Sequence, residues 1–218
     1  MHSSEAAARL TRTVTDLYQV DFIVDTGDST DLGTGFEAGY PATYLPLPKP
    51  YVWLAGNHDT PTIVRSLQGI PGVTVLQSEF VSISGITIAG FPDPASASLS
   101  PAPSTDARLV EDAARIAGIV GQGNPGSFMV AVHDPKQAAR LPGMVPVVLN
   151  GHTHREGITV RDGTVFLDVG STGGGGFRGI NHEGESPSTL QILYIKKEPL
   201  KLAAVDTITI FGFSQEFS

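Results

Sequence analysis

Four short apolar segments in this sequence each run directly into a cluster of polar residues. The segments cover residues 20–24, 51–55, 128–132 and 145–149. A mostly apolar run of this length, without polar alternation, is typical of a strand buried on both faces of a parallel sheet. The carboxyl ends of parallel neighbours meet at one edge of their sheet, so we expect these polar clusters to share one crevice although they lie far apart along the chain.

Helical and hairpin patterns lie between and after these strands. Helices are predicted at residues 5–18, 61–68 and 105–119, and further strands at 73–76, 80–84, 87–91, 157–160, 164–169, 190–196 and 200–210. Residues 32–50, with a weak helical centre at 36–44, and residues 92–103 are predicted to be mostly loop. This order predicts an α/β fold of two packed mixed sheets flanked by helices, in a single domain over residues 1–218.

Composition excludes several classes of protein. Hydrophobic residues make up 40% and charged residues 17% of the chain, as in a globular domain. The net charge of −8 argues against general nucleic-acid binding, and no apolar run is long enough for a membrane span. No basic leader precedes the first helix, so we expect a cytoplasmic location unless a leader or membrane anchor lies upstream of Met1. Because the chain has no Cys, a metal would have to be held by His, Asn, Asp or Glu.

The polar clusters are unusually rich in histidine. Four of the six His residues of the chain, His58, His133, His152 and His154, stand just after the predicted strands. A single such His is usually a hydrogen-bonded core residue. Four of them at strand ends, with Gly before or nearby, make that interpretation poor.

These residues resemble the motifs of the calcineurin-like metallophosphoesterases. That family carries Asp-x-His, Gly-Asp-x-x-Asp, Gly-Asn-His-Asp/Glu, His and Gly-His-x-His in this order, and four of the five blocks match here over nearly the whole chain. The matching blocks are residues 27–31, 56–59, 133 and 151–154. The resemblance implies a four-layered α/β/β/α sandwich with a dinuclear metal site.

The family's first block matches only in part. Its His would fall on His2 and its Asp would precede Met1, so we expect the sequence to start inside the motif and to lack the opening strand. The alternative is that His2 stands at this position by chance.

The resemblance also implies a role for each ligand. Asp28 would bridge two divalent ions, with Mn, Fe or Zn as the expected metals. His2 and His154, together with the missing Asp, would complete the first site. The second site would be completed by Asn57, His133 and His152.

The same resemblance implies how a small phosphate ester would be hydrolysed. A hydroxide bridging the ions would attack phosphorus in a phosphomonoester or phosphodiester. His58 would protonate the leaving oxygen, and Asp31 would hold the His58 ring and raise its proton affinity. Leu32 stands where the protein Ser/Thr phosphatase branch has Arg, which argues against that branch.

Other residues and another function class are weaker alternatives. Arg178 could bind a substrate phosphate, but Arg178 and His182 are each more typical of a solvated loop. Glycines 173–176 lack the Lys of a nucleotide-binding P-loop.

The competing hypothesis is a non-catalytic member of the family that serves as a binding or scaffold module. Loops 32–50, 92–104 and 171–188 carry no readable substrate code, and the oligomeric state stays open.

Overall fold

The computed structural model describes residues 4–45, 47–100, 102–124, 126–174 and 187–211. The larger sheet has six strands in the order β4-β5-β6-β7-β9-β8, with β4 and β8 antiparallel to their neighbours and the other pairs parallel. Its strands are β4 (Glu79–Ile83), β5 (Ile86–Phe91), β6 (Phe128–Val132), β7 (Val147–Asn150), β8 (Glu156–Arg161) and β9 (Thr164–Val169).

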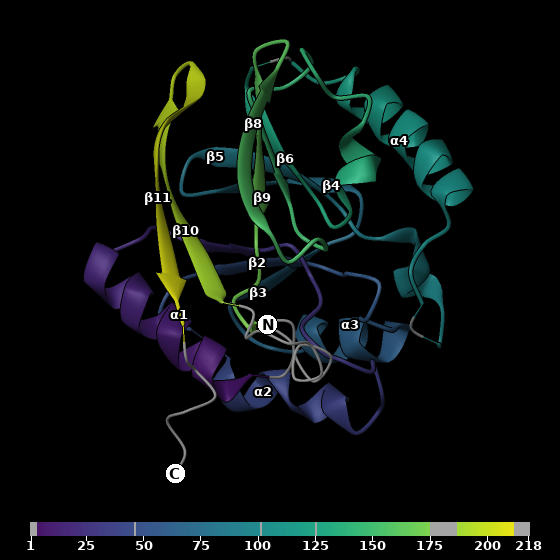
Figure 1. Cartoon of the computed structure of the whole chain (residues 1–218), viewed down its shortest axis with the longest axis vertical. Helices are drawn as coiled ribbons and strands as arrows, with labels where there is room; N and C mark the ends of the chain where they lie inside the picture. The colour runs from purple at the N-terminus through teal and green to yellow at the C-terminus, as the bar shows by residue number, and fades with distance from the viewer. Residues whose placement is uncertain (1–3, 46, 101, 125, 175–186, 212–218) are drawn as a thin grey trace.

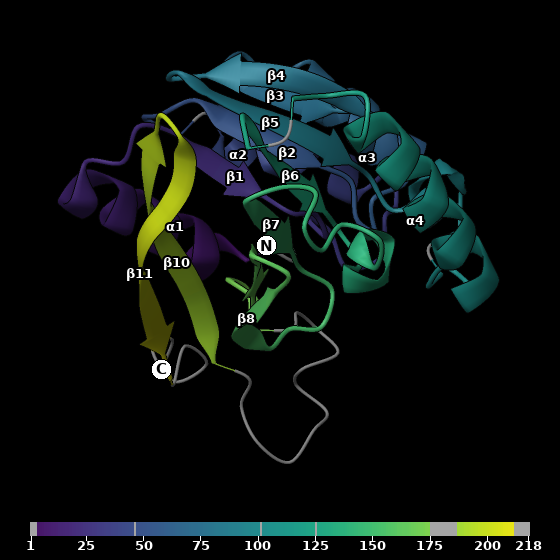
Figure 2. The ribbon, with the colours of Figure 1, turned by 90° about the horizontal axis from the view of Figure 1, so that it is seen from above.

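A smaller sheet and a hairpin complete the strands that the structure describes. The smaller sheet is parallel and consists of β1 (Ile23–Asp25), β2 (Tyr51–Leu54) and β3 (Val73–Leu76). The hairpin pairs β10 (Ser188–Lys197) with β11 (Leu200–Ile210). In Figures 1 and 2 this hairpin stands beside α1 on the side of the molecule opposite α4.

Four α-helices and three 3-10 turns lie outside the sheets in the described part of the chain. The helices are α1 (Glu5–Tyr18), α2 (Pro41–Tyr44), α3 (Pro61–Gln68) and α4 (Asp106–Val120), and the 3-10 turns are Glu37–Gly39, Pro94–Ala97 and Pro135–Ala138. α1 begins after Ser4, whose Oγ accepts the N–H of Ala7 at 3.2 Å and satisfies one free donor of the first turn. No helix among the described residues has the length and apolar character required to cross a membrane.

Side chains on alternate positions of β2 show how the layers stack. Tyr51 and Trp53 pack among residues of α1, α2 and α3, whereas Val52 and Leu54 pack against residues of the six-stranded sheet. The opposite face of that sheet packs against α4 through residues such as Ile116. Successive strand residues point to opposite faces, so β2 is covered on both sides. The predicted α/β/β/α layering is confirmed, with helices α1–α3 on one outer side and α4 on the other (Figure 1).

Among the differences from the sequence prediction, three concern the smaller sheet and β7. The smaller sheet is parallel rather than mixed over its described strands. β1 begins at Ile23 rather than at residue 20, because α1 ends in the left-handed residue Gln19 and the next residues turn the chain toward the sheet. β7 begins at Val147 rather than at residue 145, since Pro146 has no N–H to donate to a neighbouring strand. The single domain over residues 1–218 stays a prediction.

Candidate metal centre

A buried carboxylate joins the loops that follow β1 and β2. One Asp59 oxygen accepts the backbone N–H groups of Asp28 at 2.7 Å and Gly56 at 2.9 Å, and the other accepts those of Ser29 at 3.0 Å and Thr30 at 3.3 Å. Burial, and then the charge of Asp28, raise the pKa of Asp59 to about 7. This one side chain therefore holds two loops from adjacent strands in register, and it places Asp28 at the edge of the smaller sheet.

The two loops approach so closely that glycine is required at their contact. A Cβ atom on Gly56 would lie 2.2 Å from Asp28 Oδ1 and 2.5 Å from His133 Cε1. Gly27 has a φ of +106°, and a Cβ there would lie 2.4 Å from the Gly56 nitrogen. The glycines that precede Asp28 and Asn57 in the sequence thus have a packing reason, because any side chain would displace the polar residues beside them.

His133 follows β6 and is oriented by the backbone. Its Nδ1 lies 2.7 Å from the Thr26 carbonyl oxygen, which can only accept, so Nδ1 carries the hydrogen. Nε2 then faces Asn57 Oδ1 at 3.2 Å and Asp28 Oδ2 at 3.4 Å. Burial lowers the pKa of His133, but the Asp28 carboxylate and the Thr26 carbonyl outweigh burial and raise it to about 9. The surroundings of Nε2 therefore favour a positive charge at this point.

His152 follows β7 and completes the group. Its Nδ1 lies 3.0 Å from Asn57 Oδ1 and 3.2 Å from His133 Nε2, and its backbone is left-handed with a φ of 67°. Burial, and then the neighbouring His133, lower the pKa of His152. One ligand atom each from Asp28, His133 and His152 lies within 4.8 Å of the others, in an arrangement that could hold a metal ion.

We call Asp28, Asn57, His133 and His152 the ligand cluster. Its members come from the ends of β1, β2, β6 and β7, as the strand-end argument predicts. Their oxygen and nitrogen atoms face one another at 3.0 to 3.4 Å, an arrangement in which several donor atoms could bind one cation. Nitrogen and oxygen donors of this kind suit Mn, Fe and Zn, so these residues fit a divalent metal.

His58 lies beside the ligand cluster. Its backbone N–H donates to Asp28 Oδ1 at 3.0 Å, and its ring Nδ1 lies 2.6 Å from the backbone carbonyl oxygen of Asp31. We expected Asp31 to hold this ring, and its main-chain carbonyl does contact it; the predicted role of the Asp31 carboxylate stays a prediction. The carbonyl can only accept, so Nδ1 of His58 carries the hydrogen.

The other predicted site residues lie differently. His154 has a left-handed φ of 57° and lines a cavity together with Asp28, His133 and His152, but it is not among the three residues of the compact group. His2, Arg178 and His182 lie outside the described residues, so their predicted roles stay predictions.

The cavity has a volume of about 380 Å³ and lies between the edges of β1 and β10. It is lined by α1 residues such as Val14, by β1 residues such as Val24, and by β10 residues such as Ile192. Among the described strands, β1 pairs only with β2 and β10 only with β11. We call α1, β1 and β10 the cavity side of the ligand cluster, and β2, β6 and β7 its packed side.

Three residues that support the site were not identified from the sequence. Gln137 accepts the N–H of His133 at 3.1 Å and donates to the Asp112 carboxylate at 2.8 Å. Asp59 joins the two ligand loops, and Glu37 binds the loop that holds His58, as described below. Asp59 is the last residue of the 56–59 block, which was a signal of its importance, whereas nothing local in the sequence distinguishes Glu37 or Gln137.

Layered sheets with a ligand cluster at their strand ends define an α/β protein with a candidate metal centre, and the comparisons with known proteins give its family. The family model described as calcineurin-like phosphoesterase matches residues 1–156. The chain therefore belongs to the calcineurin-like phosphoesterase family, a metal-dependent family of phosphoesterases. A comparison with curated proteins found no match.

Solved structures share the fold at low sequence identity. The protein TT1561 of Thermus thermophilus has a TM-score of 0.67 at 12% identity, over 95% of this chain and 94% of that one. An archaeal protein titled a novel phosphodiesterase has a TM-score of 0.51 at 15% identity, over 94% and 92%. The sulfate thiohydrolase SoxB of Thermus thermophilus has a TM-score of 0.55 at 14% identity, over 94% of this chain and 42% of that one. At these identities the likeness concerns the fold alone.

Proposed function

We propose that this protein is a metal-dependent hydrolase of phosphomonoesters or phosphodiesters. The observation that carries the proposal is the convergence of Asp28, Asn57, His133 and His152 with His58 beside them. Membership of a phosphoesterase family supports the same reaction class. A small phosphate ester is the expected substrate, and the negative net charge of the chain argues against general nucleic-acid binding.

Two divalent ions, with Mn, Fe or Zn as the expected metals, are assigned to the ligand residues. Asn57, His133 and His152 would hold one ion, His2 and His154 would contribute to the other, and Asp28 would contact both. When bound, the ions would make a water molecule more acidic and would stabilise negative charge on the phosphoryl oxygens.

His58 is the residue that we assign to proton transfer. Because its Nδ1 hydrogen is directed at the Asp31 carbonyl oxygen, the proton available for transfer in the charged ring is the one on Nε2. We propose that Nε2 donates this proton to the leaving oxygen of the ester. The His58 backbone N–H, which binds Asp28, keeps the donor next to the ligand cluster.

A second candidate function is a non-catalytic binding or scaffold module. One observation favours it: in the described part of the chain, the compact group contains Asp28, His133 and His152, while His154 lies outside it on the wall of the cavity. A protein that holds one ion and lacks the second could bind a phosphate ester without hydrolysing it.

The substrate class can be determined by comparing the turnover of a small phosphodiester with that of a small phosphomonoester. Because one structural neighbour is titled a phosphodiesterase, a phosphodiester is the first substrate to test. The protein would be stripped of metal, reloaded with Mn, Fe or Zn, and assayed with bis-p-nitrophenyl phosphate and p-nitrophenyl phosphate. Elemental analysis would give the number of bound ions.

The same assay separates the two candidate functions. Metal-dependent turnover that exceeds the turnover of Asp28→Ala protein, purified in parallel, supports the hydrolase. Retention of bound metal without turnover of any ester in the panel would favour the binding module instead.

A further inference from the structure

Glu37 organises the loop that follows Asp31. Its carboxylate accepts the backbone N–H of Asp31 at 3.0 Å, that of Leu32 at 3.2 Å to each oxygen, and that of Thr34 at 2.9 Å. The Thr34 hydroxyl donates to the same carboxylate at 2.9 Å. Hydrogen bonds to an ionised carboxylate are stronger than neutral ones, so this single side chain determines the path of a short irregular loop.

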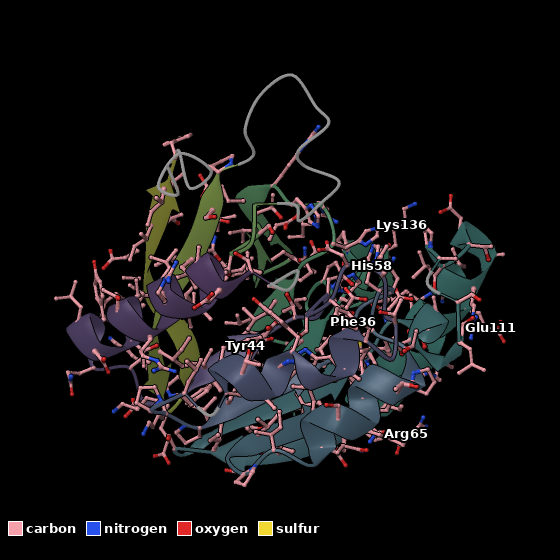
Figure 3. All side chains as sticks on the ribbon, turned by 90° about the horizontal axis from the view of Figure 1, so that it is seen from below. Phe36, Tyr44, His58, Arg65, Glu111 and Lys136 are labelled. Carbon is pink, nitrogen blue, oxygen red and sulfur yellow. The ribbon has the colours of Figure 1, made fainter. Side chains whose placement is uncertain are left out.

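One peptide group connects Glu37 with His58. The peptide bond between Asp31 and Leu32 presents its N–H to both Glu37 oxygens, and its C=O accepts Nδ1–H of His58 at 2.6 Å. The C=O and N–H of a trans peptide point in opposite directions in one plane. Glu37 and His58 therefore bind the two ends of the same rigid peptide dipole. In Figure 3 this region can be found from the labels of His58 and of Phe36, the residue before Glu37.

We infer that Glu37 is a positioning residue for His58 and acts through the Asp31–Leu32 peptide. This inference rests on the proposed function, because it assumes that His58 donates a proton. A carboxylate bound to the N–H end of a peptide increases the negative charge on its carbonyl oxygen, since hydrogen bonds in a chain polarise one another. The carbonyl then holds the His58 ring in one orientation.

A second contact anchors the same loop without using this peptide. Thr60 Oγ1 donates to the Gly33 carbonyl oxygen at 2.7 Å, and Thr60 is buried. Thr60→Val removes this hydrogen bond while it leaves the Asp31–Leu32 peptide and Glu37 untouched. It is therefore a matched control for general loosening of the loop.

The test compares Glu37→Gln with Thr60→Val on esters of different leaving groups. An alkyl or phenyl ester needs protonation of its leaving oxygen, whereas p-nitrophenolate leaves without it. We expect Glu37→Gln to lower turnover of the poor leaving group about 10-fold, from the weakening of one charge-assisted hydrogen bond. The p-nitrophenyl ester should change less than about 2-fold by the same reasoning, and the metal content should not change.

A double variant gives the decisive comparison. If Glu37 acts through His58, then adding Glu37→Gln to His58→Ala should cause no further loss, because the interaction has already been removed. Fully additive losses, or an equal loss in Thr60→Val, would overturn the inference. A wild-type protein without any turnover, or a His58→Ala variant with normal turnover, would instead contradict the proposed function.

A measurement that does not need activity keeps the inference testable in that case. The hydrogen-bonded Nδ1–H of His58 should give a shifted proton resonance in the nuclear magnetic resonance spectrum, assigned by its loss in His58→Ala. We expect this resonance to move in Glu37→Gln and to stay in place in Thr60→Val. An unchanged resonance in Glu37→Gln would show that Glu37 does not position the ring.

Discussion

The packed side and the cavity side of the ligand cluster are built differently. On the packed side, β2, β6 and β7 are buried at every position, and the ends of these strands carry Asn57, His133 and His152. On the cavity side, all three residues of β1 are half-buried, and a volume of about 380 Å³ separates β1 from β10. Close packing behind β2, β6 and β7 thus fixes the positions of Asn57, His133 and His152, whereas Asp28 follows the less buried strand β1 and is held in the same group by Asp59.

The largest effect is expected at Asp28, which follows a cavity-side strand but contacts packed-side residues. Asp28→Ala should abolish binding of both ions, with a loss of affinity greater than about 100-fold, because even residues outside the ligand set contribute 10- to 100-fold. Elemental analysis after dialysis would measure bound metal. An Asp28→Ala protein that keeps a full complement of metal would break the assignment of Asp28 as a shared ligand.

The next effect separates proton transfer from metal binding. His58→Ala should lower turnover of esters with poor leaving groups by roughly two to four orders of magnitude, because a general acid is removed. Its metal content should stay near that of the wild type, since His58 is placed beside the ligands and is not one of them. Parallel metal and turnover measurements check this, and equal metal losses in His58→Ala and Asp28→Ala would contradict it.

A pair of histidine variants in the loop after β7 tests which of the two residues holds the more tightly bound ion. His152→Ala, on the packed side, should weaken the more tightly bound ion by at least about 10-fold to 100-fold. His154→Ala, two residues further along the same loop after β7 and outside the compact group, should leave that ion in place and affect only a second one. Calorimetric titration with Zn or Mn would separate the two binding steps, and the reverse order of effects would show that His154 belongs to the stronger site.

The smallest effect concerns stability. Val148 is fully buried in β7, whereas Val24 in β1 is half-buried and lines the cavity. Val148→Ala should destabilise the protein by about 2 kcal/mol, from two lost methyl groups and the space they leave. Val24→Ala should cost less than about 1 kcal/mol, because fewer contacts are lost. Urea unfolding of the two metal-free variants would measure the difference, and equal losses would mean that β1 is as well packed as β7.

Much of the candidate site could be predicted because it depends on local order. Asp28, Asn57, His133 and His152 each stand within three residues of the end of an apolar strand, and parallel strands bring such positions to one edge. The sequence also directed attention to Asp31, and the structure shows that its main-chain carbonyl contacts the His58 ring. The orientation of a peptide plane depends on what binds both of its ends, and sequence patterns do not report it.

Hydrophobic runs and short motifs are local properties of the chain, so the succession of strands, the residue types at their ends and the family could be predicted from the amino-acid sequence. Three features became visible only in the folded structure: Glu37 reaches the peptide that holds His58, Asp59 joins the loops after β1 and β2, and a cavity separates β1 from β10. These features depend on contacts between segments that lie apart in the sequence and on loop paths set by hydrogen bonds. Their geometry exists only once the layers have packed.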